Sequence, residues 1–322
     1  MKKVTILGGG TGSFVVLSGL KSQPVDLAAI VTMMDSGGST GRLRDQLGVL
    51  PPGDLRQCLV ALSDAPILWR ELFLYRFEHG DLKGHNFGNI FISALQKVSD
   101  DYQEVIDTAS YVLKTKGKVI PVTFEDTHLG VEYMSGKILK KEGTIDEDNL
   151  EKTKIKRAFL EPEVKAHQNA IARIQESDTI IIGPGDLYTS IIPILLTKGM
   201  KEAIQNSKAK VIYNLNLMNK NGQTTDYKGS DHVEDITEYA GREPDIVVVN
   251  SAQIPQNILE WYKTHNETVT ENDLASSQYK GTVVQADLIS DQEFNKSESD
   301  VLSRSILRHD AQKLTNVLLE YI

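Results

Sequence analysis

Residues 4–13 read Val-Thr-Ile-Leu-Gly-Gly-Gly-Thr-Gly-Ser, and this stretch decides the fold. The first four residues form a short, mostly apolar run that ends at glycine, which is typical of a buried strand. The glycines permit a tight turn, and the apolar spacing from Phe14 to Leu20 predicts a helix directly after it. A strand that passes through glycines into a helix is the opening unit of a Rossmann-like α/β fold.

The same alternation continues along the chain and predicts a doubly wound, mainly parallel sheet in one nucleotide-binding domain over residues 1–322. A period-two pattern and a charged, exposed run (140–156) predict a small insertion at about 116–156, and a polar, irregular region is expected at 264–296 with a strand at 282–284. The tail from 299 to 322 has helical spacing. Further strands are expected at 27–31, 179–182, 210–214 and 245–250, and helices at 55–62, 68–77, 90–98 and 102–113.

Composition excludes several classes of protein. Acidic residues outnumber basic ones by 44 to 35, and the net charge of −9 argues against a nucleic-acid binder, which needs a basic face. The single cysteine, Cys58, excludes an intrachain disulfide framework. No apolar run approaches the roughly 18 residues of a membrane span, and the apolar part of the N-terminus is too short for a signal peptide. We therefore expect a cytoplasmic protein with no membrane span.

The first glycine loop is a candidate diphosphate site. Glycines let a ligand approach the backbone closely, and the N-terminus of the following helix offers N–H groups that no helical carbonyl accepts. The spacing G-x-G-x-G departs from the G-x-G-x-x-G pattern of a plain NAD site, and the loop could also be a purely structural turn. The candidate ligand-binding residues here are Gly9, Gly10, Thr11, Gly12 and Ser13.

A second glycine-rich loop follows the strand expected at 27–31. Asp35 lies where a carboxylate commonly meets a ribose hydroxyl. Arginine grips phosphate oxygens in pairs, so the loop is suited to an anion. The alternative is a surface loop in which Asp35 is a turn residue. Its candidate anion-binding residues are Gly38, Ser39, Arg42 and Arg44.

Two further motifs open helices. In residues 51–56, Asp54 is expected to cap the helix, and Arg56 in the first turn, where a cation opposes the helix dipole, weakly suggests a bound anion. In residues 84–89, Asn86 or Asn89 is expected to cap the next helix or contact the ligand, and His85 is a candidate acid–base group.

The fifth motif, residues 183–190, repeats the strand–glycine–helix pattern. Gly185, Thr189 and Ser190 could bind an anion at the helix start, because ligands of open α/β sheets bind beyond the carboxyl ends of strands. Asn214 and Asn216 also follow a strand, where uncharged amides could read a base.

Together the five motifs resemble the family that joins the gluconeogenesis factors (YvcK-like proteins) with the 2-phospho-L-lactate transferases (CofD-like enzymes). The resemblance covers residues 4 to about 250. It implies either a binder of UDP-sugars, notably UDP-N-acetylglucosamine, needed for normal cell shape on gluconeogenic carbon sources, or a transferase that moves a phospholactyl group from a nucleoside diphosphate donor with magnesium. The motifs are more similar to the first branch.

One position departs from the family pattern. The family often has two adjacent aspartates before the double glycine, whereas this chain has Asp35 and then Ser36. Losing a carboxylate weakens a magnesium site, so we expect no metal or other cofactor to be required, with Mg²⁺ only in the enzyme alternative. The catalytic candidates for that alternative are Asp35, Asp54 and His85.

We therefore predict a non-enzymatic regulator that binds a nucleotide-diphosphate sugar. A regulatory protein partner and a homo-oligomer are expected. An NAD-dependent oxidoreductase is a third alternative, suggested by the first loop alone.

Overall fold

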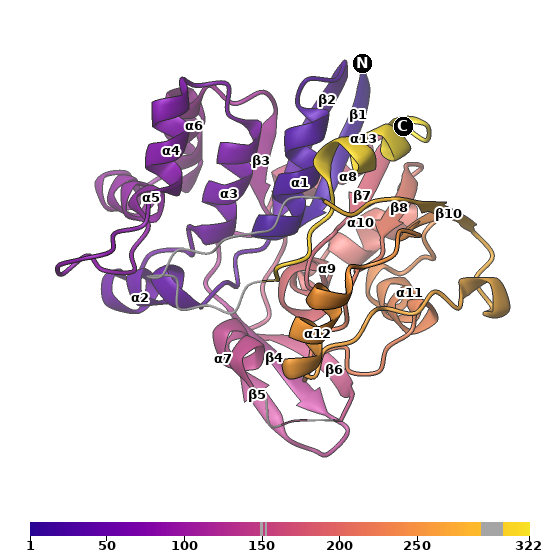
Figure 1. Cartoon of the computed structure of the whole chain (residues 1–322). Helices are drawn as coiled ribbons and strands as arrows, with labels where there is room; N and C mark the ends of the chain where they lie inside the picture. The colour runs from indigo at the N-terminus through magenta and orange to yellow at the C-terminus, as the bar shows by residue number, and fades with distance from the viewer. Residues whose placement is uncertain (149–150, 152, 291–304) are drawn as a thin grey trace.

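The computed structural model describes residues 1–148, 151, 153–290 and 305–322. Its main sheet is parallel throughout, with strand order β10-β9-β8-β7-β1-β2-β3 (Figure 1). The predicted fold class is confirmed. The strands are β1 (Lys2–Gly8), β2 (Val25–Val31), β3 (Lys118–Pro121), β7 (Thr179–Ile182), β8 (Lys210–Asn214), β9 (Ile246–Asn250) and β10 (Thr282–Ala286).

The strand order reverses between β1 and β7. From β1 the chain proceeds outward through β2 and β3, whereas from β7 it proceeds the other way through β8, β9 and β10. Loops that leave β1 and β7 therefore diverge to opposite faces, and the crevice between them is where open α/β sheets bind ligands.

Helices cover the sheet, and Figure 1 shows α1, α3 and α13 grouped together over one face. The helix α1 contacts both of the other two. The helices are α1 (Gly10–Leu20), α2 (Gly38–Leu47), α3 (Gly53–Leu62), α4 (Ile67–Leu74), α5 (Phe87–Val98), α6 (Tyr102–Leu113), α7 (Glu142–Glu147), α8 (Gln168–Glu176), a π-helical turn (Leu187–Ile191), α9 (Ile192–Leu196), α10 (Met200–Asn206), α11 (Gly229–Ala240), α12 (Gln256–Thr264), a 3-10 turn (Leu274–Ser276) and α13 (Ala311–Leu319).

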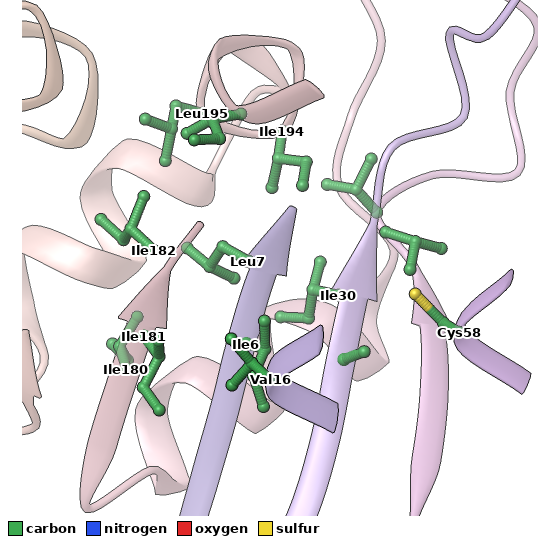
Figure 2. Packing of buried hydrophobic residues seen from close by; sticks show 14 of the residues in the cluster. Ile6, Leu7, Val16, Ile30, Cys58, Ile180, Ile181, Ile182, Ile194 and Leu195 are labelled. Carbon is green, nitrogen blue, oxygen red and sulfur yellow. The ribbon is translucent and has the colours of Figure 1, made fainter. Parts of the chain in front are cut away.

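The core lies along the central strands. Ile6, Ile30 and Ile181 are fully buried, and Figure 2 shows them packed between helices with Val16 and Cys58. Burial of each large aliphatic side chain stabilises the fold by about 1.5–3 kcal/mol. The strands have near-continuous apolar sequences because both faces of the sheet are covered.

The insertion is a three-stranded antiparallel sheet of β4 (His128–Tyr133), β5 (Ile138–Lys140) and β6 (Ile155–Glu161). Its extent differs from the expected 116–156, because residues 118–121 pair with β2 in the main sheet. The expected exposure of residues 140–156 is wrong for α7, whose Ile145 is fully buried. The charged residues of this stretch gave no sign that α7 buries an apolar side chain in the core.

The expected tail helix is present as α13, and it packs on α1. Leu314 and Leu318 are fully buried there, and Leu302 lies outside the described residues. Across the described ranges, which omit 149–150, 152 and 291–304, no helix is long and apolar enough to cross a membrane.

Candidate functional site

A cavity of about 260 Å³ lies beyond the carboxyl ends of the central strands. Each of four neighbouring strands, β1, β2, β7 and β8, contributes the loop that follows it. The predicted site residues that line it are Gly10, Thr11, Gly12, Asp35, Ser39, Asp54, Asn89, Gly185, Thr189, Ser190 and Asn216.

The glycine loop after β1 is shaped by close packing. A Cβ atom on Gly12 would lie 1.9 Å from the carbonyl oxygen of Pro184, in the loop after β7. This glycine therefore lets the loop after β1 touch the loop after β7, at the point where the strand order of the sheet reverses. The helix α1 begins at Gly10, so the N–H groups of its first turn point toward the cavity end of the helix, where its dipole is positive.

Asp54 caps the N-terminus of α1 and does not cap α3, the helix in which it lies. Its Oδ1 accepts the Gly10 N–H at 2.7 Å, and a Cβ on Gly9 would lie only 2.6 Å from its Oδ2. The expectation that Asp54 caps α3 is wrong, because the cap position is Pro52 and no side chain bonds there. A carboxylate stabilised by the α1 N-terminus thus borders the cavity.

The loop after β2 is held by local hydrogen bonds. Asp35 Oδ1 accepts the Gly37 N–H at 2.9 Å, which forms the tight turn before α2. Ser39 is buried, and its hydroxyl lies 3.3 Å from His85 Nδ1. Burial, Arg42 and Arg76 lower the pKa of His85, so its imidazole is neutral at pH 7.

Other predicted residues do not line the cavity, and several have protein partners that explain why. Buried Arg44 donates to Asp126 and to the Thr127 carbonyl, and Arg42 is exposed and donates to the Lys83 carbonyl at 3.1 Å. Asn214 is fully buried, and its Nδ2 donates to the Gly183 carbonyl at 3.1 Å. The remaining residues of this group are Gly9, Ser13, Gly38, His85 and Asn86.

Asn86 is the N-cap of α5, which was one of the two roles predicted for it. Its Oδ1 accepts the Asn89 N–H at 3.2 Å. Asn89 is left to line the cavity, where its own Oδ1 accepts from Arg56 Nε at 2.7 Å. Arg56 is buried in the first turn of α3. A cation is unfavourable beside the positive end of a helix dipole, and this was the reason to expect an anion near Arg56.

Glu142 is a cavity residue that sequence reasoning missed. Its Oε2 accepts the Ser36 N–H at 3.2 Å, while Ser36 Oγ accepts the Gly143 N–H at 2.9 Å. Glu142 therefore places a carboxylate beside position 36, where this chain lacks the second aspartate. Burial, Asp35 and Asp146 raise the pKa of Glu142 well above its ordinary value.

Lys220 joins the insertion to the main sheet and was also missed. Its ammonium pairs with Asp146 of α7 and with Asp186 at 2.8 Å. Burial alone would lower the pKa of Lys220, but the two carboxylates outweigh burial and raise it. Lys220 is thus a fixed cation at the wall of the cavity.

No sequence pattern could have placed these residues at the site. Glu142 lies more than 100 positions from Ser36, whose N–H it accepts. His309, which also lines the cavity, comes from the tail, and Trp261 comes from a stretch just before the region expected to be irregular.

The site provides charge and hydrogen bonds but no assembled metal centre. Within the described ranges, no group of three or more His, Cys, Asp or Glu side chains is placed to hold a metal ion. The arrangement is suited to binding a polar, anionic molecule that carries hydroxyl groups, because it combines a helix N-terminus, fixed cations and several carboxylates.

Comparisons with known proteins agree with the motifs. Residues 4–289 match the family model described as 2-phospho-L-lactate transferase CofD. The gluconeogenesis factor of Bacillus subtilis is 38% identical over 99% of this chain and 98% of its own length. That of Halalkalibacterium halodurans is 39% identical over 99% and 96%.

A solved structure has the same fold. The crystal structure of a UPF0052 family member from Bacillus halodurans superposes with a TM-score of 0.90 at 36% identity and covers 99% of this chain and all of that one. The resemblance read from the five motifs is thereby confirmed, and the chain belongs to the CofD-related family of the gluconeogenesis factors.

Proposed function

We propose that this protein is a cytoplasmic, non-enzymatic regulator that binds UDP-sugars, with UDP-N-acetylglucosamine as the reference ligand, and acts in gluconeogenic growth and cell morphology. The observation that carries the proposal is the junction of the β1 and β7 loops. There the first turn of α1 and the Thr189 and Ser190 hydroxyls line one cavity at the switch point of the sheet.

A nucleotide-diphosphate sugar matches the two kinds of group at this junction. The diphosphate needs N–H donors and cations, which the α1 N-terminus, Arg56 and Lys220 supply. Sugar and ribose hydroxyls donate to carboxylates, and Asp35 and Glu142 border the same space. A ligand that orders loops from four strands together with the insertion could be read by a partner protein.

Isothermal titration calorimetry tests the proposal. UDP-N-acetylglucosamine should bind without Mg²⁺ and should be recovered unchanged after long incubation. Ser190→Asp puts a carboxylate beside the diphosphate and should weaken binding at least tenfold. Ser22→Asp, which adds the same charge at an exposed turn, is the matched control and should bind normally. Absence of UDP-sugar binding to the unaltered protein would refute the proposal.

Gly12 is a poor position for that test. A larger side chain there would strike the Pro184 carbonyl whether or not a ligand binds. Loss of affinity in a Gly12 variant would therefore not separate packing from recognition.

The second candidate is a transferase of a phospholactyl-type group from a nucleoside diphosphate donor. It is favoured by the cluster of Asp35, Asp54 and Glu142 at the cavity and by the family of the chain. Mg²⁺ often takes only one or two carboxylates and completes its shell with phosphate oxygens. Asp35 and Glu142 fit that need, and the ion would neutralise phosphate charge. Magnesium-dependent consumption of a donor would support this candidate over the first.

A further inference from the structure

The far end of the cavity, away from the glycine loop, has a different chemistry. A chain of contacts leads there: the Gly185 carbonyl of the β7 loop accepts from Asn216 Nδ2 at 2.9 Å, and Leu217 follows in the β8 loop. Leu217 belongs to a second apolar cluster with Tyr262 and Leu307, against which Trp261 packs. This end carries these apolar and aromatic side chains together with the charged Glu267 and Arg308, whereas the other end holds the carboxylates Asp35, Asp54 and Glu142.

Trp261 of α12 lines this end of the cavity, and neighbouring aromatic rings hold its indole in place. The His265 imidazole stacks on the indole, with ring centroids 4.0 Å apart and planes 28° apart. His265 Nδ1 lies 2.9 Å from the Trp261 carbonyl oxygen, and the Tyr262 ring is T-shaped to the indole, with ring centroids 4.9 Å apart. One indole face is therefore covered by protein, and Trp261 is still a lining residue of the cavity.

His309 lies at the same end of the cavity. It is 8% exposed, it lines the cavity, and its Nε2 is buried with no hydrogen bond to any residue that the structure describes. A buried polar nitrogen without a partner costs free energy unless a ligand or water satisfies it. The Leu307 N–H donates to the Tyr262 hydroxyl at 3.1 Å, which ties the segment before His309 to α12.

We propose that Trp261 and His309 form the subsite for the nucleobase, in which the base stacks on the indole and exchanges a hydrogen bond with the imidazole. A base is flat and apolar on its faces and polar at its edge, so it suits an aromatic side chain and an imidazole that line the same cavity. A sugar needs several hydroxyl partners, and these lie at the carboxylate end. Burial lowers the pKa of His309 to about 4, so a neutral imidazole meets the base at pH 7.

The inference rests on the proposed function, and its test is built on the two tryptophans of the chain. Trp69 does not line the cavity, so Trp69→Phe leaves Trp261 as the single reporter of emission. Titration of this variant with UMP and UDP should change Trp261 emission, whereas pyrophosphate and N-acetylglucosamine 1-phosphate should not. GDP serves as the purine arm, and its relative affinity reports which ring size fits.

Affinity measurements complete the test. Trp261→Ala should weaken UDP binding by on the order of tenfold or more, in the range found for loss of one base stack, and Trp261→Phe should restore part of it. His309→Ala should weaken UDP and leave pyrophosphate unchanged. Trp69→Ala, the matched control, should bind UDP as the unaltered protein does. Thermal unfolding of each variant checks that it folds.

The outcomes separate the two proposals. UDP-sugar binding that leaves Trp261 emission unchanged and survives Trp261→Ala overturns the base subsite and leaves the proposed function intact. An emission change with N-acetylglucosamine 1-phosphate but not with UMP assigns the aromatic end to the sugar and also overturns it. Absence of any nucleotide binding to the unaltered protein removes both.

Discussion

At the scale of single residues, burial and neighbouring charge set the chemistry of the site. Glu142 is a carboxyl whose charged form is disfavoured by burial and by Asp35 and Asp146. The folded protein therefore binds a proton here that the unfolded chain releases at a lower pH. A protonated Glu142 also presents less negative charge to an anionic ligand.

We predict that Glu142→Gln changes the pH dependence of stability. The raised pKa means that the contribution of Glu142 is fully present below about pH 4.3, the unfolded value, and is lost as the pH rises through the folded value. Relative to the unaltered protein, the variant should become more stable as the pH rises from 5 to 8, by at most about 1.4 kcal/mol per pH unit. Urea unfolding at several pH values measures this.

Glu132 provides the contrast for this measurement. Hydrogen bonds from Lys156 and Arg157 lower its pKa, so its contribution is present above about pH 4.3 and is lost only in more acidic solution. Glu132→Gln should shift stability by a constant amount between pH 5 and 8. Parallel curves for the Glu142 variant and the unaltered protein would contradict the raised pKa.

At the scale of elements, α1 connects the site to the C-terminus of the chain. Its first turn borders the cavity, and its last turn receives α13. A Cβ on Gly19 would lie 1.8 Å from Thr315 Oγ1 and 2.8 Å from the Ala311 carbonyl oxygen. The two helices therefore approach so closely that only glycine fits at their contact.

We predict that Gly19→Ala destabilises the protein, although the same change in an uncrowded helix stabilises by about 0.5–1 kcal/mol. The new methyl group pushes α13 outward and exposes Leu314 and Leu318, so limited proteolysis should release the C-terminal helix faster. Adding Thr315→Ala removes the shortest contact and should restore part of the loss. A Gly19→Ala protein of unchanged or higher stability would show that the helices can separate without cost.

At the scale of the whole molecule, the helix α4 carries a group of neighbouring exposed apolar side chains. On α4, Ile67 is 69% exposed, Leu68 75% and Trp69 40%, and Leu74 and Tyr75 continue the patch. The helix also carries Arg70 beside Glu71, so the surface has no net charge of its own in a chain of net charge −9. A two-fold contact through α4 would bring the same patch of both copies together, so that Arg70 and Glu71 of each copy lie in one interface.

The expected homo-oligomer is thus predicted to form through α4. Leu68→Glu should move the mass measured by light scattering from dimer toward monomer, because it buries a charge in the contact. Val98→Glu, at an isolated residue that is 87% exposed, is the control and should leave the mass unchanged. A monomeric unaltered protein at micromolar concentration would refute the prediction.

The sequence by itself determined the fold class and six of the seven strands of the described parallel sheet, and it predicted a ligand site at the carboxyl ends of these strands. A short, mostly apolar run such as residues 4–7, followed at once by glycines and then by helical spacing, is typical of a buried strand that turns into a helix. Asp35, Thr189 and Ser190 were found because local order puts them at strand ends, and the carboxyl ends of parallel strands meet at one edge. Asn86 was found as one of two cap candidates for the same local reason.

Only the tertiary structure decided which side chains complete the site and which are used elsewhere. Three predicted residues bond to groups that are far away in sequence. Asp54 accepts the Gly10 N–H of α1, and Arg44 donates to Asp126. Asn214 donates to the Gly183 carbonyl. Glu142 and His309 reach the cavity from the insertion and the tail. Local pattern fixes an element and the face that it buries, but a buried polar group is satisfied by whichever partner the folded chain brings within about 3 Å, and that distance exists only after folding.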